Sequence, residues 1–288
     1  MLKLTPEEHK YVAQYIHEIS GITIEYKRAY LIETRLYNLV QDFGLSSYIE
    51  LCRMAKSDLS KSTEKMIIDA ITTNETLFFR DTEPFELIEK KILPDLVNIR
   101  RKQSNISPIP IRIWSSACST GQEIFSIAIV LKELLSDIEN YDIELLGTDI
   151  SDAAVVQASQ GIYNKFEIER GLEISKLNKY FYPDGNNWKI KDEIKNMATF
   201  MKHNLMKPFN RSIKFDIIFC RNVAIYFYLE DRKYLFEKIA KVLQPDGYLI
   251  IGATESLTGI CPMFEAKRHL GSVYYQLKDK NDYHNNNF

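Results

Sequence analysis

The segment from Ile111 to Leu131 restricts the fold of this 288-residue chain more than any other part of the sequence. It begins with a short apolar run that predicts a buried strand, and the small residues from Ser115 to Gly121 then require a turn. Apolar side chains follow with the i, i+3, i+4, i+7 spacing of a helix that packs one face on a sheet, at Ile124, Ile127, Ala128 and Leu131. A strand, a turn and a helix in this order predict the first unit of an open α/β fold, whose ligands bind beyond the carboxyl ends of the strands.

The turn in this segment differs from the dinucleotide-binding fingerprint. G-x-G-x-x-G needs three glycines, and the turn offers only Gly121, which disfavours an NAD-dependent oxidoreductase. Glu123 lies in the first turn of the helix, where it would repel a phosphate and attract a cationic group of a ligand. Taken alone, Glu123 could equally be a surface residue that complements the helix dipole.

A second acidic residue follows the next predicted strand. Ile143 to Leu146 form an apolar run, and Asp149 comes shortly after it, where a carboxylate binds a ribose diol in this class of fold. The alternative is that Asp149 or Ser151 caps the helix that starts at Ala153, and the residues alone leave both interpretations open.

Further segments occur in a fixed order along the chain. They are Thr73 to Asp81, Ile113 to Ile127, Leu146 to Ile150, Asn204 with Leu205, Phe215 to Phe227 and Leu243 to Gly247. In order and spacing they resemble the chemotaxis protein methyltransferases of the CheR family, which methylate receptor glutamates, and the likeness extends from about Pro6 to about Leu277. The implied cofactor is S-adenosylmethionine, with S-adenosylhomocysteine as product. It is a nucleoside with a positive charge and no phosphate, as Glu123 and Asp149 together favour.

The resemblance implies an α/β fold, a seven-stranded class I S-adenosylmethionine-dependent methyltransferase sheet (Rossmann-like) with a small antiparallel β-insert, preceded by an all-α N-terminal domain. We expect a helical, receptor-docking domain at residues 1–80 and a methyltransferase domain at 81–280. The insert is expected at about 161–197 and a polar tail at 281–288. The sequence pattern agrees, since helical patterns without a strand signal fill the first eighty or so residues.

Local signals divide this N-terminal region into four helices. A capping box from Thr5 to Glu8 begins the first helix and Gly21 ends it, while Ser47 begins the third and the fourth ends near Thr73. The second helix is expected to end at Gly44 and to bury four apolar residues, Ile32, Leu36, Leu39 and Phe43.

The remaining strands are expected from apolar and β-branched runs. Tyr180 to Tyr182 and Trp188 to Ile190 predict a hairpin across a turn at Pro183 to Asn187. The main-sheet strands are expected at Ala198 to Lys202, Phe215 to Cys220, Tyr248 to Gly252, Phe264 to Lys267 and Val273 to Leu277. The short hairpin tip lacks the basic, glycine-rich loop of the family's peptide binders, so we expect no tether to a receptor C-terminal peptide.

The resemblance also implies the site residues. The cofactor-binding set is Asn74, Thr76, Arg80, Glu123, Asp149, Asn204, Leu205, Arg221 and Asn222, and the catalytic pair is Arg80 and Tyr226. Glu123, Arg221 and Asn222 would lie at the methionine end of the cofactor, Asp149 at the ribose, and Asn204 with Leu205 at the adenine. The alternatives are that Asn74 and Thr76 cap a helix end and that Tyr226 is a core aromatic.

The expected reaction needs no general base. A glutamate side chain has a reference pKa of about 4.3 and is therefore ionised at neutral pH. The enzyme has to align the carboxylate with the methyl group, and Arg80 could hold it by two hydrogen bonds while the hydroxyl of Tyr226 orients it.

The expected partners are the cytoplasmic helices of methyl-accepting chemotaxis receptors. Lys27, Arg28 and Arg35 are basic residues that could meet acidic receptor helices, and a solvated helix face is the alternative. The residues do not identify the receptor, its modified glutamates or the oligomeric state.

Composition and spacing exclude several other classes. A net charge of −2 gives no footprint for nucleic acid, and the exit of the Phe215 to Cys220 strand lacks the proline loop of DNA N-methyltransferases. The four cysteines and five histidines show no metal-ligand spacing, so no metal is expected. No apolar run is long enough to span a membrane, which favours a cytoplasmic protein without membrane insertion. Two alternatives stay open, namely a methyltransferase of the same fold for another protein or a small carboxylate, and a non-catalytic cofactor-binding module.

Overall fold

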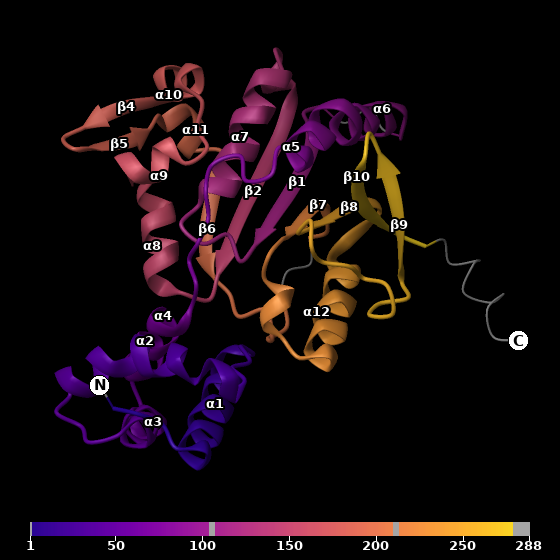
Figure 1. The fold of residues 1–288 in the computed structure, drawn as a ribbon. Helices are drawn as coiled ribbons and strands as arrows, with labels where there is room; N and C mark the ends of the chain where they lie inside the picture. Colours follow the sequence, from indigo (N-terminus) through magenta and orange to yellow (C-terminus); the bar gives the residue numbers. More distant parts are fainter. Residues whose placement is uncertain (1, 104–106, 210–212, 279–288) are drawn as a thin grey trace, which may run out of the picture.

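A seven-stranded sheet lies at the centre of the computed structural model, which describes residues 2–103, 107–209 and 213–278 (Figure 1). In chain order its strands are β1 (Ile109–Ser116), β2 (Tyr141–Asp149), β6 (Ala198–Lys202), β7 (Phe215–Cys220), β8 (Leu243–Ile251), β9 (Phe264–His269) and β10 (Ser272–Leu277). Across the sheet the order is β6-β2-β1-β7-β8-β10-β9. All pairs are parallel except those of β10 with β8 and β9, so the expected sheet with an antiparallel edge pair is confirmed.

The central strands bury both of their faces. Ile113 and Ile217 pack in one core with the helices α7 (Gln122–Leu134), α5 (Glu83–Leu87), π-helical η2 (Ile88–Ile92) and α6 (Leu93–Gln103). Their chain neighbours Trp114 and Ile218 point to the opposite face and pack with α12 (Leu229–Val242). Every residue of β7 is buried, which explains why its sequence is a nearly continuous apolar run.

The first four helices of the chain have a core of their own. They are α1 (Pro6–Ser20), α2 (Ala29–Asp42), α3 (Tyr48–Ser57) and α4 (Ser62–Ile71), with a 3-10 turn, η1 (Tyr26–Arg28), before α2. The expected capping box of α1 is present, and Gly21 ends that helix with φ of 78°. The apolar cluster of these helices runs from Leu4 to Ile71 and is separate from the two clusters on the sheet.

One expectation for the second helix is wrong. Phe43 is 38% exposed, whereas Val40 is fully buried. The buried apolar positions of α2 are Ile32, Leu36 and Val40, a spacing of four residues, and the helix ends at Asp42. Phe43 therefore lies beyond the last helical turn and points away from the core, and Leu39 is only partly buried.

An insert with its own small sheet follows α8 (Asp152–Gln160). It contains β3 (Ile162–Asn164), α9 (Lys165–Glu169), α10 (Ile174–Tyr180), β4 (Phe181–Asp184), β5 (Asn187–Ile190) and α11 (Asp192–Lys195). Its strand order is β3-β5-β4, so the predicted hairpin is present and β3 is an additional strand. The hairpin arms are longer than expected, because Pro183 pairs with Trp188. This is possible since β4 is an edge strand, where proline need not donate a hydrogen bond.

The carboxyl-terminal half of the sheet differs from expectation at one strand. β8 begins at Leu243 and includes Pro245 to Gly247, whereas the strand was expected to begin at Tyr248. The pairing of β8 with β7 shifts between Leu243 and Tyr248, so these residues form an irregularity within the strand. The expected polar tail, 281–288, lies outside the described residues.

A buried ion-pair cluster ties α6 to the sheet. Arg100 donates to Asp216 Oδ1 and to Asp246 Oδ2, each at 2.5 Å, and Asp216 Oδ2 accepts from the Arg112 amide at 2.8 Å. Asp216 is only 3% exposed, so the guanidinium of Arg100 compensates a carboxylate that water hardly reaches.

We expect Arg100→Ala to lower the free energy of unfolding by about 3–5 kcal/mol, because it leaves Asp216 buried without its cation. Urea denaturation of the purified protein measures this change. The control is Arg101→Ala, whose side chain is 57% exposed and lies 4.0 Å from Asp137. Its loss should be below about 1 kcal/mol, and equal losses for the two variants would contradict the assignment.

Candidate functional site

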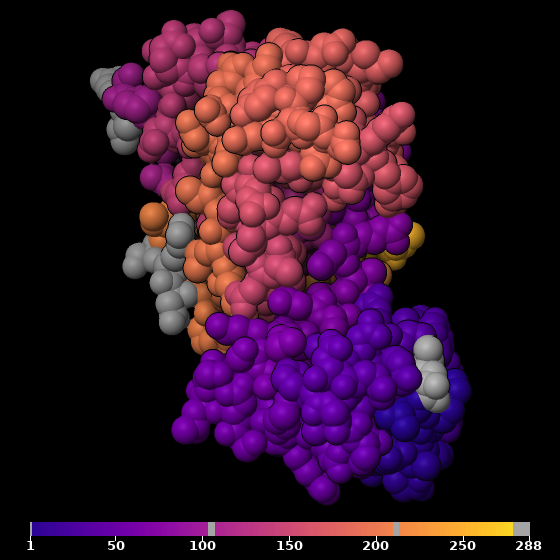
Figure 2. Space-filling view, turned by 90° about the vertical axis from the view of Figure 1, so that its left-hand side faces the viewer, coloured from indigo at the N-terminus to yellow at the C-terminus, as the bar shows by residue number. Residues whose placement is uncertain are grey.

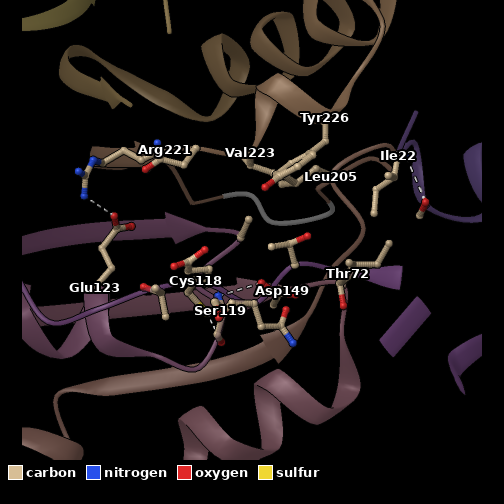
Figure 3. A pocket seen from close by; sticks show the side chains of 18 of the residues that line it. Ile22, Thr72, Cys118, Ser119, Glu123, Asp149, Leu205, Arg221, Val223 and Tyr226 are labelled. Atoms are coloured by element: carbon tan, nitrogen blue, oxygen red, sulfur yellow. Dashed lines mark hydrogen bonds and ion pairs between the residues drawn. The ribbon is translucent and has the colours of Figure 1, made fainter. Parts of the chain in front are cut away.

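A cavity lies at the carboxyl ends of the parallel strands, between the sheet and the N-terminal helices (Figure 3). It encloses about 860 Å³, including its opening to solvent. The end of α1, the segment after α4, the β1–α7 turn, the end of β2 and the loop after β7 all contribute to its wall. The order of the parallel strands reverses between β1 and β7, and this is the position at which open α/β sheets bind their ligands.

The β1–α7 turn forms the floor of the cavity. Ala117 and Ser119 adopt left-handed backbone conformations with φ of 55° and 51°, although neither is glycine. Gly121, with φ of 94°, packs so closely on α8 that an added Cβ would lie 3.0 Å from the Cβ of Ala158. Such conformations persist only where the surrounding structure holds them, and they concentrate at binding sites.

Asp149 holds this turn and faces the cavity. Its Oδ2 accepts from the Ser119 amide at 2.8 Å and its Oδ1 from the Ser151 amide at 3.0 Å. Burial raises the pKa of the Asp149 carboxyl, while these amide hydrogen bonds act in the opposite direction. Ser151 caps α8 by accepting from Ala154 N, which resolves the alternative, since the cap is Ser151 and the carboxylate of Asp149 lines the cavity.

Arg221 forms a buried ion-pair network beside the cavity. Its guanidinium lies 2.9 Å from Glu123 Oε2 and 2.7 Å from Asp81 Oδ2, and it donates to the Arg80 carbonyl at 2.8 Å. Glu123 also accepts from the Ser115 hydroxyl at 2.7 Å, and Figure 3 shows its ion pair with Arg221. Two carboxylates share one guanidinium, so the formal charge of the network is −1, and Glu123, the carboxylate of the network that lines the cavity, suits a cationic ligand group.

These contacts decide between the two interpretations of Glu123, and they add Asp81 to the residues of the site. The Glu123 side chain is only 13% exposed, so it is not a surface residue that merely complements the helix dipole. The network partner Asp81 was not among the expected site residues. Its acidic side chain follows Arg80 directly in sequence, but nothing local indicates that it pairs with Arg221.

The segment after α4 brings Asn74, Thr76 and Arg80 to the cavity. The alternative that Asn74 and Thr76 cap α4 does not hold, because Arg35 satisfies that helix end. Its guanidinium donates to the carbonyls of Ile71 at 2.5 Å and Thr72 at 3.0 Å. Arg35 is therefore engaged inside the protein, which contradicts its expected place on a free basic docking surface.

Arg80 and Tyr226 line the cavity from opposite segments. The Arg80 guanidinium donates to the Glu75 carbonyl at 3.1 Å. Tyr226 ends the short helix η4 (Ala224–Tyr226), and its carbonyl accepts from the Thr23 amide and hydroxyl, both at 2.9 Å. The Tyr226 ring is partly buried and its hydroxyl points into the cavity (Figure 3), so this residue is not simply a core aromatic.

The structure contradicts the expectation that the Asn204 side chain reads an adenine edge. Its amide nitrogen donates to the Ile19 carbonyl at 3.0 Å, and its amide oxygen accepts from Met206 N at 2.8 Å. Asn204 thus joins the end of β6 to the end of α1, and it is absent from the cavity wall. Its neighbour Leu205 does line the cavity, as expected.

Several lining residues were not among the expected site residues, although Cys118 and Val223 lie within the segments that resemble the family. Examples are Ile22, Thr72, Cys118, His203 and Val223. Burial, together with the positive charge of Lys238, lowers the pKa of His203 to about 4, so this imidazole is neutral at pH 7. Burial raises the pKa of the Cys118 thiol well above its usual range, so this cysteine is not an activated nucleophile.

Between residues 2 and 278, excluding 104–106 and 210–212, there is no cluster of three or more His, Cys, Asp or Glu side chains that could hold a metal ion. In the same ranges, every helix is too short or too polar to cross a membrane.

Comparison with known proteins identifies the family. Residues 74–269 match the family model "CheR methyltransferase, SAM binding domain". A chemotaxis protein methyltransferase of Vibrio parahaemolyticus is 35% identical over 280 residues, which cover 96% of this chain and 99% of that protein. Chemotaxis protein methyltransferase 1 of Pseudomonas aeruginosa is 33% identical, with coverage of 92% and 95%. The corresponding protein of Borreliella burgdorferi is 35% identical, with coverage of 90% and 91%.

A solved structure, magnesium protoporphyrin IX methyltransferase from Synechocystis with bound S-adenosylmethionine, matches with a TM-score of 0.38 at 14% identity. The match covers 84% of this chain and 96% of that one, and at this level it supports no inference about function. The family match rests on the sequence, and its region contains the Asp149 carboxylate, the anionic Arg221 network and the strained β1–α7 turn. The chain belongs to the CheR family of S-adenosylmethionine-dependent methyltransferases.

Proposed function

We propose that this protein transfers the methyl group of S-adenosylmethionine to glutamate side chains of methyl-accepting chemoreceptors and forms glutamate methyl esters. The main support is the cavity wall, where Glu123 and Arg221, two members of the anionic Glu123–Arg221–Asp81 network, lie beside two hydrogen-bond donors, Arg80 and Tyr226. The first element suits a cationic cofactor, and the second suits an anionic acceptor. The names of the relatives, chemotaxis protein methyltransferases, support the same substrate class.

The cofactor's parts fit the residues of the wall in chemical terms. Asp149 is an acceptor for ribose hydroxyls, since ionised carboxylates accept several hydrogen bonds. Glu123 and Asn222 lie on the side of Arg221 and would bind the methionine end, whose ammonium is cationic. Leu205 supplies apolar surface for the adenine, and Asn74 and Thr76 add polar groups from the segment after α4.

Catalysis is then a matter of positioning. When bound, S-adenosylmethionine supplies a methyl group on a positively charged sulfur. A glutamate with a pKa of about 4.3 arrives ionised, so no residue has to remove a proton. Arg80 holds the glutamate carboxylate through its guanidinium, and the Tyr226 hydroxyl is a second hydrogen-bond donor that orients it. Alignment of this kind contributes up to about 7–11 kcal/mol in the best intramolecular cases.

Receptor docking would use the basic residues near the start of α2. Lys27 and Arg28 remain for this role, whereas Arg35 is engaged at the end of α4. Receptor cytoplasmic helices place the reaction in the cytoplasm. The insert lies at the end of the molecule opposite the N-terminal helices (Figure 2), and its hairpin tip between β4 and β5 is two residues long. We therefore propose that the protein works without a receptor C-terminal tether.

A second candidate is a methyltransferase of this fold for another protein or a small carboxylate. The reduced basic set favours it, because only Lys27 and Arg28 remain and Lys27 pairs with Glu25 at 2.5 Å.

The substrate test is transfer of radiolabelled methyl to receptor-containing membranes from the same cell, followed by mild base. We expect label in a receptor band and its release as volatile methanol, which is the signature of a carboxyl methyl ester. Cofactor binding without receptor labelling would favour the second candidate, a methyltransferase for another protein or a small carboxylate.

Arg80→Ala should lower kcat for receptor methylation by about 100-fold, the size of effect that misplacement of a reacting group produces. The dissociation constant of S-adenosylhomocysteine, measured by calorimetry, should rise by less than about tenfold. Arg80→Lys should recover only part of the turnover, because an ammonium lacks the bidentate geometry of a guanidinium. Unchanged turnover in Arg80→Ala would rule out its assigned role.

Lys27→Glu should raise the KM for receptor about fivefold at low salt, the size of one exposed charge pair, and less at high salt. The affinity for S-adenosylhomocysteine should not change, since Lys27 does not line the cavity. Lys102→Glu makes the same charge change at an exposed position of α6 and serves as control. An equal rise in KM for both variants would mean that net charge, not docking, is responsible.

A further inference from the structure

Glu255 lies behind the wall of the cofactor cavity, in the turn that follows β8. Its Oε2 accepts two backbone hydrogen bonds, from Gly252 at 2.7 Å and from Asn222 at 2.8 Å. The two donors follow neighbouring parallel strands, β8 and β7, so one carboxylate oxygen ties the ends of both strands together. Glu255 is absent from the cavity wall, whereas Asn222 is part of it.

Asn222 needs such an anchor because of its backbone. Its φ is 56°, a left-handed conformation that costs a residue other than glycine of the order of 1 kcal/mol or more. It directly follows Arg221, whose guanidinium is committed to Glu123 and Asp81. The hydrogen bond from Asn222 N to Glu255 therefore fixes the turn that presents both residues to the cavity.

Gly252 shows how closely these groups approach. A Cβ at this position would lie 2.7 Å from Glu255 Oε2, 2.9 Å from Asn222 Nδ2 and 3.1 Å from Asn222 N. Any side chain at residue 252 would displace the carboxylate or the asparagine. Glycine is thus required here by the close approach of Glu255 and Asn222 and not by its own backbone conformation.

The acceptor is well suited to the two amides. Hydrogen bonds to an ionised group are stronger than those between neutral groups, and a buried amide that loses its acceptor carries a full desolvation cost. Removal of the carboxylate would leave the amides of Gly252 and Asn222 without this partner at the same time. The other oxygen of Glu255, Oε1, is buried and has no hydrogen-bond partner among the described residues.

We propose that Glu255 is a positioning residue for the cofactor site, which acts by holding Asn222, and with it Arg221, against the methionine end of S-adenosylmethionine. This rests on the proposed function in one respect, the assignment of Asn222 to that end of the cofactor. It requires no contact between Glu255 and the cofactor.

The test uses the full-length protein and S-adenosylhomocysteine as the probe, with calorimetric dissociation constants. We expect Glu255→Ala to weaken binding about tenfold or more and Glu255→Gln to weaken it about threefold, since a glutamine oxygen can still accept from both amides. Gly252→Ala should resemble Glu255→Ala, because the added methyl group displaces the same contact. The control Glu265→Gln removes a carboxylate paired with Lys267 on the edge strand β9 and should bind as the unchanged protein does.

A second readout separates positioning from general stability. In amide NMR spectra, the Asn222 and Gly252 proton signals should move upfield in Glu255→Ala and return partly in Glu255→Gln. Binding by Glu255→Ala within twofold of the unchanged protein, or Glu255→Gln no better than Glu255→Ala, would overturn the proposal. If Glu255→Ala does not fold, Glu255→Gln and Gly252→Ala decide the question. The measurement needs no receptor, so a failure of receptor methylation leaves this result intact. Likewise, unchanged binding by Glu255→Ala would overturn the role of Glu255 and leave the proposed methylation of receptors untouched.

Discussion

The Arg221 guanidinium is the contact on which the site depends. Its side chain is 2% exposed. It joins Glu123 on α7 to Asp81 and the carbonyl of Arg80, which lie in the segment between α4 and α5. These groups come from separate parts of the chain, and the guanidinium of Arg221 could not be buried as a charge without them. The ion pairs therefore hold the segment between α4 and α5 against the sheet. They also leave one uncompensated negative charge beside the cavity. Structure and electrostatics are set here by the same set of contacts.

The features that the sequence predicted well are those determined by local pattern. The strand, turn and helix from Ile111 to Leu131 follow from burial and small residues, and Asp149 follows from its place at the end of β2. The same logic located the N-terminal helices, because the capping box at Thr5 and the stop at Gly21 act within a few residues. Phe43 was misassigned because Leu39 and Val40 both fit the helical spacing from Ile32 and Leu36, and only the packing of the folded helices decides that Val40 is the buried one.

The features that the sequence could not predict depend on partners distant in the chain. Asn204 bonds to Ile19, 185 residues away, and Arg35 bonds to the end of α4, 36 residues away. An amide or a guanidinium of this kind is chemically able to bind a ligand, and only the fold determines whether its hydrogen bonds are already used. Asp81 is the opposite case, since its role appears only once Arg221 lies beside it.

The N-terminal helices contribute to the site directly as well as flanking it. Ser20, Ile22 and Thr72 line the cavity, and two of the contacts that join the two parts end on residues beside it. Thr23 bonds to the Tyr226 carbonyl, and Asp69 accepts from the Ser151 hydroxyl at 2.7 Å, next to Asp149. A displacement of these helices would therefore move the backbone of Tyr226 and the cap beside Asp149 together. Because Tyr226 and Asp149 both line the cavity, the position of the N-terminal helices determines the geometry of the binding site.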